Sequence, residues 1–260
     1  MSKINVNTWE PESSTALTMG ASGDTTTVPS GASLVVASGA TINITGATQT
    51  GFPSAGFAGV HADVSSGSET YTVPADITKL LVFITGGGGS GSSGTTGLGN
   101  GGGGGAAGTV IARVTVVAAD TITIAIGAGG VVTANSSGQI GNVGGDSTFT
   151  HASGSGSFDT ITAPGGRLGP LISTQITAPV APTVGASNEG IAVKGAGYGT
   201  PESIGAASFW GSGGAHGIHS VAAATAAVAF GSGGGGGTYS AGLFYGAVGA
   251  DGVCFIMEFK

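Results

Sequence analysis

Residues 86–105 contain 13 glycines in 20 positions, and glycine makes up 55 of the chain's 260 residues. Because glycine costs about 1 kcal/mol relative to alanine at each helix position, this tract argues against a helical protein. Within the tract, glycine recurs every third residue, at Gly88, Gly91, Gly94, Gly97 and Gly103. That period suits polyglycine II-type helices, which have three residues per turn. The tracts are interspersed with small and apolar residues rather than charges, which favours ordered packing over flexible surface loops, the alternative interpretation.

Four segments show the alternation of apolar residues that is typical of β-strands. They are 77–85, 109–117, 121–126 and 252–260. Because strands stand at both ends of this region, we expect one glycine-rich β domain over 69–260, preceded by a linker at 51–68. The predicted fold class is therefore all-β, with polyglycine II-type helices inside the domain.

An eight-residue repeat occupies 22–50, in units that open with Ser-Gly and place Val or Ile seventh. Three short units cannot bury an apolar face by themselves, so we expect a trimeric β shaft in which copies from three chains stack. The residues predicted to form the trimer core are Val28, Leu34, Val36, Ile42 and Ile44. The alternative is a small solenoid patch, or edge hairpins, on the main domain.

The first 21 residues are polar except for a few positions, among which Trp9 stands out. Aromatic side chains dominate the contact energy of many interfaces, so Trp9 is a candidate anchor to another protein. The alternative is that Trp9 packs back onto its own shaft. The segment 1–21 is predicted to be an attachment arm.

Charge and hydropathy exclude several classes of partner. Charged residues make up 7% of the chain, the formal net charge is −7, and the six Lys and Arg residues are scattered along the sequence. We therefore expect no nucleic-acid binding, which depends on neutralising phosphates. No apolar run approaches the 18 residues of a membrane helix, and no signal-peptide pattern is present. The single Cys254 excludes an intramolecular disulfide.

The sequence also offers little catalytic chemistry. The pattern Gly86-x-Gly88-x-x-Gly91 lacks the following helix and the acidic residue that a dinucleotide site needs. His216 and His219 have a spacing that suits a metal, but a single pair is typical of a plain loop. The acidic residues show no spacing that selects a pair for glycoside hydrolysis. We expect a protein that is not an enzyme and binds no cofactor or metal.

Three variable stretches interrupt the glycine tracts, at 167–183, 200–210 and 239–245. Loops on a rigid scaffold are the usual place for recognition, and Tyr and Trp provide contact area at low entropic cost. The candidate receptor-binding residues are Phe209, Trp210, Tyr239, Phe244 and Tyr245.

An ordered set of motifs runs through 69–260. It consists of YTVPADI at 71–77 followed by a hydrophobic strand and GGGGSG at 86–91, GGGGGAAGTV at 101–110, TITIAIGAGG at 121–130, GGDSTF at 144–149, APGG at 163–166 and ADGVCFIMEF at 250–259. This set resembles the glycine-rich domain of bacteriophage tail fibres and is similar to the distal adhesins of T-even-like phages. The chain departs from the pattern in a long insert at 167–230 and in the turn at 118–120, and no receptor-binding residue can be transferred.

The resemblance implies a homotrimeric virion protein that is made in the host cytoplasm and acts in host attachment. Its partners would be other tail or fibre-base proteins, held by the arm that contains Trp9, and a bacterial receptor. That receptor would be an outer-membrane protein or a polysaccharide. The alternative function is a structural virion component, such as a capsid decoration or head fibre. A third interpretation is a free-standing ice-binding or surface-adhesion protein.

Overall fold

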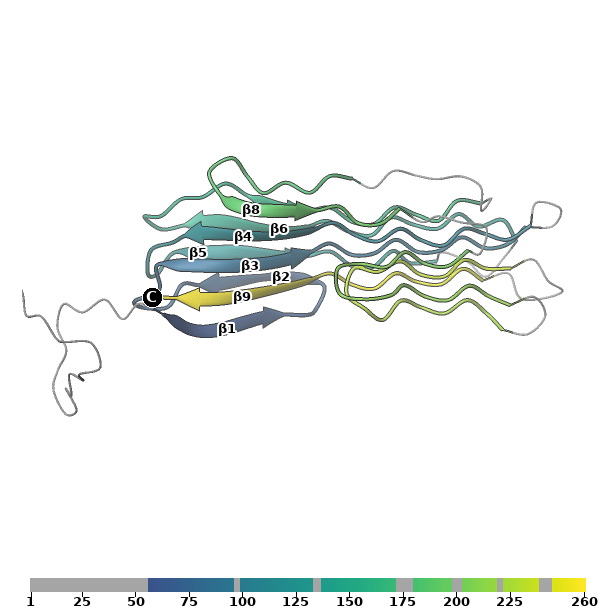
Figure 1. Ribbon diagram of the computed structural model, residues 1–260, viewed down its shortest axis with the longest axis horizontal. Coiled ribbons are helices and arrows are strands. Elements are labelled where there is room, and N and C mark those ends of the chain that lie inside the picture. Colours follow the sequence, from purple (N-terminus) through teal and green to yellow (C-terminus); the bar gives the residue numbers. More distant parts are fainter. Residues whose placement is uncertain are drawn as a thin grey trace, which may run out of the picture. The chain divides into compact units, whose positions relative to one another are not determined.

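Nine strands form two antiparallel sheets in the computed structural model (Figure 1). In the five-stranded sheet the order is β1 (Phe57–Asp63), β9 (Val253–Phe259), β3 (Lys79–Thr85), β4 (Thr109–Thr115) and β8 (Glu189–Val193). In the four-stranded sheet the order is β2 (Gly67–Thr72), β5 (Thr121–Ile126), β6 (Ser147–Ser153) and β7 (Ile161–Ala163). The predicted all-β class is confirmed.

The structure describes residues 56–95, 99–132, 137–171, 180–197, 203–218, 222–238 and 245–260. These residues contain no helix, and so none that is long and apolar enough to cross a membrane. They all belong to one compact unit, Pro53–Lys260. The predicted attachment arm with Trp9 and the predicted trimer core from Val28 to Ile44 lie outside the described residues.

The two sheets enclose a core of aliphatic side chains. Alternate residues of β3, Leu80, Val82 and Ile84, are fully buried and belong to one cluster with Ile124 of β5 and Phe149 of β6. Because side chains of a strand point alternately to its two faces, each sheet contributes one apolar face to this core. The predicted strand 121–126 matches β5, whose burial alternates along its whole length.

The glycine-rich domain begins earlier than residue 69. β1 and the first two residues of β2 fall within 51–68, the segment expected to be a linker. β1 pairs antiparallel with β9, so that Val60 lies opposite Met257. The sequence of β1, FAGVHAD, has weak alternation because it is an edge strand with small residues. Its partner is almost 200 positions away, and no local pattern reveals such a pairing.

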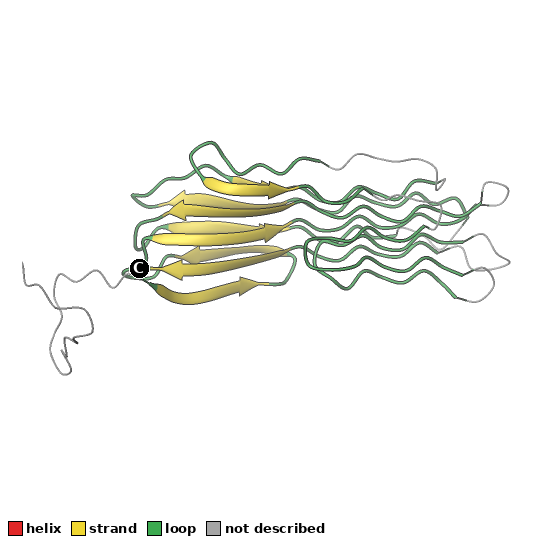
Figure 2. Cartoon of the chain, viewed as in Figure 1, coloured by secondary structure: helices red, strands yellow, loops and turns green. Residues whose placement is uncertain are grey.

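Beyond the strands, the chain continues as extended segments joined by backbone hydrogen bonds, and Figure 2 shows these as loops that run away from the strand ends. We call them together the glycine lattice. Its described segments are 86–95, 99–108, 127–132, 137–146, 164–171, 194–197, 203–207, 211–218, 222–238 and 245–252.

Segment 86–95 shows how the glycine lattice is bonded. The backbone N–H of Gly87 donates to Gly145, that of Gly88 to Ala250 and that of Gly89 to Gly105, at 2.8–2.9 Å. Three consecutive residues therefore bond three different segments, whereas a β-strand bonds two neighbours in one plane. The backbone groups are buried and paired, as buried polar groups must be. The glycine tract is thus an ordered part of the fold.

Candidate functional site

The described residues that flank four connections of the glycine lattice lie at its end away from the strands. These connections are 96–98, 133–136, 219–221 and 239–244. We call this end the far end and define it by the described residues that flank these connections. Thr95 and Gly99 bond each other in both directions, at 2.9 and 3.2 Å, and Ile218 and Ala222 do the same at 2.8 and 3.1 Å. Each of these two connections therefore starts from a fixed pair of backbone positions.

Hydrogen bonds between segments place these flanking residues at one end. Gly138 donates to the carbonyl of Gly94 at 3.1 Å, next to the Thr95–Gly99 pair. Gly101 donates to Gly237 at 2.8 Å, and Gly217, beside Ile218, donates to Gly236 at 3.0 Å. The far end is therefore a single bonded platform from which several loops depart.

Two serine side chains replace glycine within segment 86–95 and complete its bonding. The Ser90 hydroxyl donates to the carbonyl of Val131 at 3.2 Å and accepts the N–H of Asn142 at 2.7 Å. The Ser92 hydroxyl donates to the carbonyl of Gly169 and accepts the N–H of Gly141, the latter at 2.8 Å. Both residues are fully buried, so each hydroxyl bridges two neighbouring segments from inside the glycine lattice.

Unpaired hydroxyls distinguish the far end from the rest of the glycine lattice. Among the described residues, the buried side chains of Ser93, Thr95, Ser203 and Thr238 have no hydrogen-bond partner. Ser93, Thr95 and Thr238 lie at or near the ends of two of these connections. The Ser203 carbonyl accepts the N–H of Gly236, two residues before Thr238, at 2.7 Å. A buried polar group without a hydrogen-bond partner costs free energy. The hydrogen bonding of buried side chains is therefore less complete, and less stabilising, at the far end than in the segments nearer the strands.

The candidate residues Phe209 and Trp210 lie elsewhere, where the glycine lattice meets the strands. The Trp210 indole donates to the Thr85 hydroxyl at 2.8 Å, at the end of β3. Its ring contacts Phe209 and Phe255 at centroid distances of 5.1 and 5.3 Å, and Phe230 at 6.5 Å. Phe209 is 49% exposed. In this position Trp210 packs against the sheet rather than standing on a distal loop.

The candidate Tyr245 lies at a different level of the glycine lattice. Its neighbour Gly246 packs against the carbonyl of Gly91, which is six residues beyond Thr85 along the same segment. At about 3 Å per residue, roughly 18 Å separate the levels of Tyr245 and Trp210. Tyr239 and Phe244 lie outside the described residues. The described candidates therefore fall in two places and do not form one patch.

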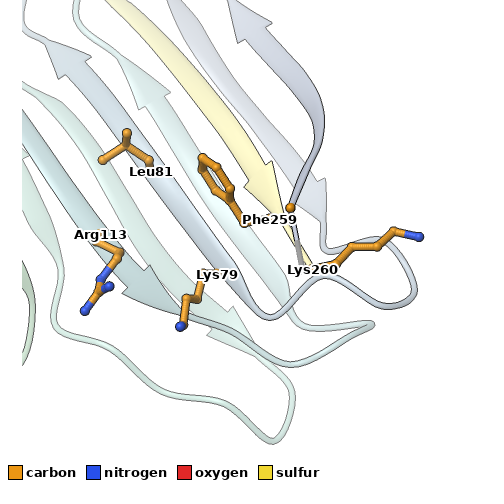
Figure 3. A pocket seen from close by; sticks show the side chains of 6 residues that line it. Lys79, Leu81, Arg113, Phe259 and Lys260 are labelled. Atoms are coloured by element: carbon orange, nitrogen blue, oxygen red, sulfur yellow. The ribbon is translucent and has the colours of Figure 1, made fainter. Parts of the chain in front are cut away.

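At the other end of the strands, a cavity of about 320 Å³ lies on the five-stranded sheet (Figure 3). Its lining residues are Gly56, Lys79, Leu81, Arg113, Phe259 and Lys260. Three of the chain's six Lys and Arg residues thus gather here, although they are far apart in the sequence. Two of them carry carboxylate partners: Arg113 pairs with Glu189 at 2.5 Å and Lys260 with Asp76 at 3.8 Å.

The buried ionisable groups stabilise the fold. Asp120 closes the turn before β5 and accepts the N–H groups of Val117 and Gly156 at 2.8 and 3.1 Å. Burial alone would raise the pKa of Asp120, but these bonds, with the nearby His151, lower it. Burial, together with a hydrogen bond to Glu258, raises the pKa of the Tyr71 phenol.

No metal-binding group is found among the residues that the structure describes. There, no three His, Cys, Asp or Glu side chains lie close enough together to hold a metal ion. His216 is described, whereas His219, its partner in the sequence pattern, is not. Burial raises the pKa of Cys254, so its thiol stays protonated at neutral pH.

The described residues define an all-β protein in which a two-sheet sandwich continues as a bundle of glycine-rich backbone segments. The chain belongs to a family that shares a glycine-rich domain, whose model matches residues 62–257. The match begins within β1 and ends within β9, so it spans both the sandwich and the glycine lattice. A comparison with curated proteins finds no match to this chain.

Proposed function

We propose that this chain is a subunit of a bacteriophage tail fibre that recognises the host cell surface through loops at the far end. The observation that carries the proposal is the convergence of four connections on one hydrogen-bonded platform. A rigid scaffold that presents several variable loops together is the usual arrangement for recognition. The resemblance of the motifs to phage fibre domains supplies the biological setting.

The glycine segments are, in this proposal, polyglycine II-type helices. The support is a three-residue period in hydrogen-bond partners along segment 86–95. Gly86, Gly89 and Ser92 donate to Gly108, Gly105 and Gly102 in turn, and the next residue of each triplet donates to Gly145, Asn142 and Gln139. A helix with three residues per turn presents every third residue to the same neighbour. This arrangement stiffens the scaffold without side chains.

The remaining parts of the fibre follow from the sequence. The repeats at 22–50 would join three chains through Val28, Leu34, Val36, Ile42 and Ile44, and the arm with Trp9 would attach the trimer to tail or fibre-base proteins. Three tips on one fibre multiply a weak contact with a receptor, an outer-membrane protein or a polysaccharide, through effective concentration. The proposed activity is binding in the virion, with no catalysis and no cofactor.

The test compares aromatic residues at the two levels of the glycine lattice. The double variant Phe244→Ala/Tyr245→Ala changes Tyr245, which flanks one connection of the far end, together with the candidate residue before it in the sequence. Phe209→Ala is the matched control at the level of the strands. Purified full-length chain should block adsorption of the virus to host cells. The double variant should need at least about tenfold more protein for the same block, as expected when a contact of 1.4 kcal/mol or more is lost.

The control variant should block as well as the original chain. Thermal unfolding of all three proteins checks that the variants are folded. If the double variant and the original chain block adsorption equally, the receptor contact is not at this end. If none of the proteins blocks adsorption, a structural role in the virion is favoured.

A further inference from the structure

The two sheets expose outer faces of opposite character. The outer face of the five-stranded sheet is apolar on its three neighbouring strands β1, β9 and β3. We define this apolar face by Phe57, Val60, Leu81, Phe83, Phe255 and Met257. The residues of β3 and β9 alternate with buried core residues of the same strands, so they point away from the core. Val60 of β1 lies opposite Met257, and Phe57 lies opposite Phe259, which puts both on the same face. Phe57 and Val60 are 58% and 59% exposed, whereas Leu81, Phe83, Phe255 and Met257 are half-buried. Trp210 and Phe230 pack on Phe255, at the edge of the apolar face next to the glycine lattice.

The four-stranded sheet provides an internal comparison. Its outer face carries threonines at the equivalent positions: Thr70 of β2 lies opposite Thr123 of β5, which lies opposite Thr150 of β6. Threonine forms strands well and keeps a hydroxyl in water. The same chain therefore builds a water-facing sheet from threonine and builds the other outer face from Phe, Leu, Val and Met. This difference indicates that the apolar face is covered in the functional protein.

The apolar face is large enough to matter. In Figure 1, no described segment lies in front of the middle of the five-stranded sheet. The three strands that carry it, about 4.8 Å apart and about 23 Å long, cover roughly 330 Å². The largest apolar patch of a monomeric protein measures about 300–600 Å² and is often functional, and a standard interface takes about 800 Å² from each partner. The face thus has the size of a functional patch and supplies about two fifths of one side of a standard interface.

The position of Gly56, the first described residue, indicates what covers the apolar face. The 55 residues before Gly56 include the repeats at 22–50, and Gly56 lines the cavity on this same sheet, next to Phe259 and Lys260. Copies joined through the preceding repeats would therefore bring the same end of each domain together, at high effective concentration. We propose that copies of this chain pack their apolar faces together around a common axis.

The charges at the rim are compatible with this packing. Arg113 and Lys260 stand beside the apolar face, and each has a carboxylate of its own chain, Glu189 and Asp76 respectively. Lys79, which lines the same cavity, is the one of these three cations without an ion pair among the described residues. Copies that meet here with the same orientation would therefore bring one unpaired positive charge per chain to the rim. An apolar centre with a charged rim is the usual anatomy of a protein interface. The inference rests on the proposed fibre for the joining of the copies through the repeats and for their number.

The experiment measures thiol labelling of the full-length chain with a maleimide. Cys254 is the chain's only cysteine and is fully buried, with its thiolate disfavoured, so one introduced cysteine reports alone. Val60→Cys and Met257→Cys place probes at a directly paired position of β1 and β9. Thr70→Cys and Thr123→Cys are the matched controls, at a directly paired position of β2 and β5.

The apolar face, if covered, should label about tenfold or more slowly than the matched control, because labelling requires an accessible thiolate. Molecular mass, measured on the same samples, separates the two proposals. If the chain is a trimer and the Val60→Cys and Met257→Cys thiols react as fast as the controls, the proposed interface is wrong. The proposed trimeric fibre is then still supported. Protected thiols in a dimer support the interface and overturn the trimer. A freely labelled monomer overturns both.

Discussion

The sandwich and the glycine lattice solve the problem of a buried interior in opposite ways. In the sandwich, side chains such as Ile84 and Ile124 fill the space between two sheets. In the glycine lattice, backbone packs directly on backbone: an atom placed as Cβ on Gly89 would lie 1.9 Å from the carbonyl oxygen of Arg167. One continuous segment, β3 followed by 86–95, passes from the first arrangement to the second at Thr85.

The two arrangements should respond differently to a single methyl group. Removing a methyl from a packed core, as in an isoleucine-to-valine change, costs about 1 kcal/mol. In the glycine lattice the sensitive change is the addition of a methyl, because the neighbouring atoms are backbone and are fixed by hydrogen bonds on several sides. Stability of the sandwich therefore falls when a side chain loses a methyl group, and stability of the glycine lattice falls when a glycine gains one.

The largest effect is expected for Gly89→Ala. The added methyl would overlap the Arg167 carbonyl, and segment 86–95 cannot move because Gly89 also bonds Gly105 and Gly234. We expect a loss of more than about 4 kcal/mol in the free energy of unfolding, in the range reserved for severe overpacking or broken networks. Urea denaturation of the full chain gives the value.

Gly105→Ala is the matched control for Gly89→Ala. Gly105 is hydrogen-bonded to Gly89 and faces the same residue, but a Cβ there would lie 3.1 Å from the Arg167 nitrogen. A shift of a few tenths of an ångström relieves that contact, so we expect a loss of about 1–2 kcal/mol. Equal stability of the two variants would show that segments 86–95 and 164–171 are not packed backbone to backbone.

A smaller effect is expected for Ser92→Ala, which tests the side chains inside the glycine lattice. The variant leaves the carbonyl of Gly169 and the N–H of Gly141 without the partner that Ser92 provides. Each unpaired buried group costs about 1–3 kcal/mol, so we expect a loss of about 3 kcal/mol, measured in the same urea titration.

The neighbouring residue is the control for that prediction. Ser93 is as buried as Ser92, but its hydroxyl has no partner. Ser93→Ala should therefore leave stability unchanged or raise it slightly, since it removes a buried polar group that bonds nothing. A loss in Ser93→Ala as large as that in Ser92→Ala would mean that packing volume, rather than hydrogen bonding, decides stability here.

The sandwich was more predictable from the sequence than the glycine lattice because its signal is local. The alternation in 121–126 gives β5 to the residue, and the apolar run at 77–85 gives β3 within two residues. β8, Glu189–Val193, was missed because it has only five residues, and Ile191 and Val193 give too short an alternation to indicate a strand. Strand pairing across the whole chain, as between β1 and β9, has no local signature.

The candidate site was predictable only in part. The glycine period indicated ordered segments, and these are ordered and hydrogen-bonded. The aromatic residues of the variable stretches were grouped as one recognition surface, but Trp210 packs against Thr85 and Phe255 near the strands, whereas Tyr245 lies farther along the glycine lattice. Sequence position alone does not tell at which end of the glycine lattice a residue lies.

The smallest loss of stability is expected for Asp120→Asn in the sandwich, which removes a charge and leaves the side-chain volume unchanged. Asp120→Asn keeps the shape of the side chain, but one N–H group, that of Val117 or of Gly156, would face an amide donor instead of a carboxylate oxygen. We expect a loss of about 2 kcal/mol at neutral pH, within the range for a buried hydrogen bond to a charged group.

The pH dependence separates this charge effect from a general loss of packing. Because the pKa of Asp120 is lowered in the folded protein, its charge stabilises the fold fully above the unfolded pKa of about 3.9. This stabilisation is lost as the pH falls from there through the folded pKa. The stability difference between the original chain and Asp120→Asn should therefore shrink below about pH 4. The difference between Ser92→Ala and the original chain, which involves no ionisable side chain, should stay constant over the same range. If the Asp120→Asn difference also stays constant, the turn before β5 depends on hydrogen-bond geometry alone, and the sandwich and the glycine lattice are then alike in this respect.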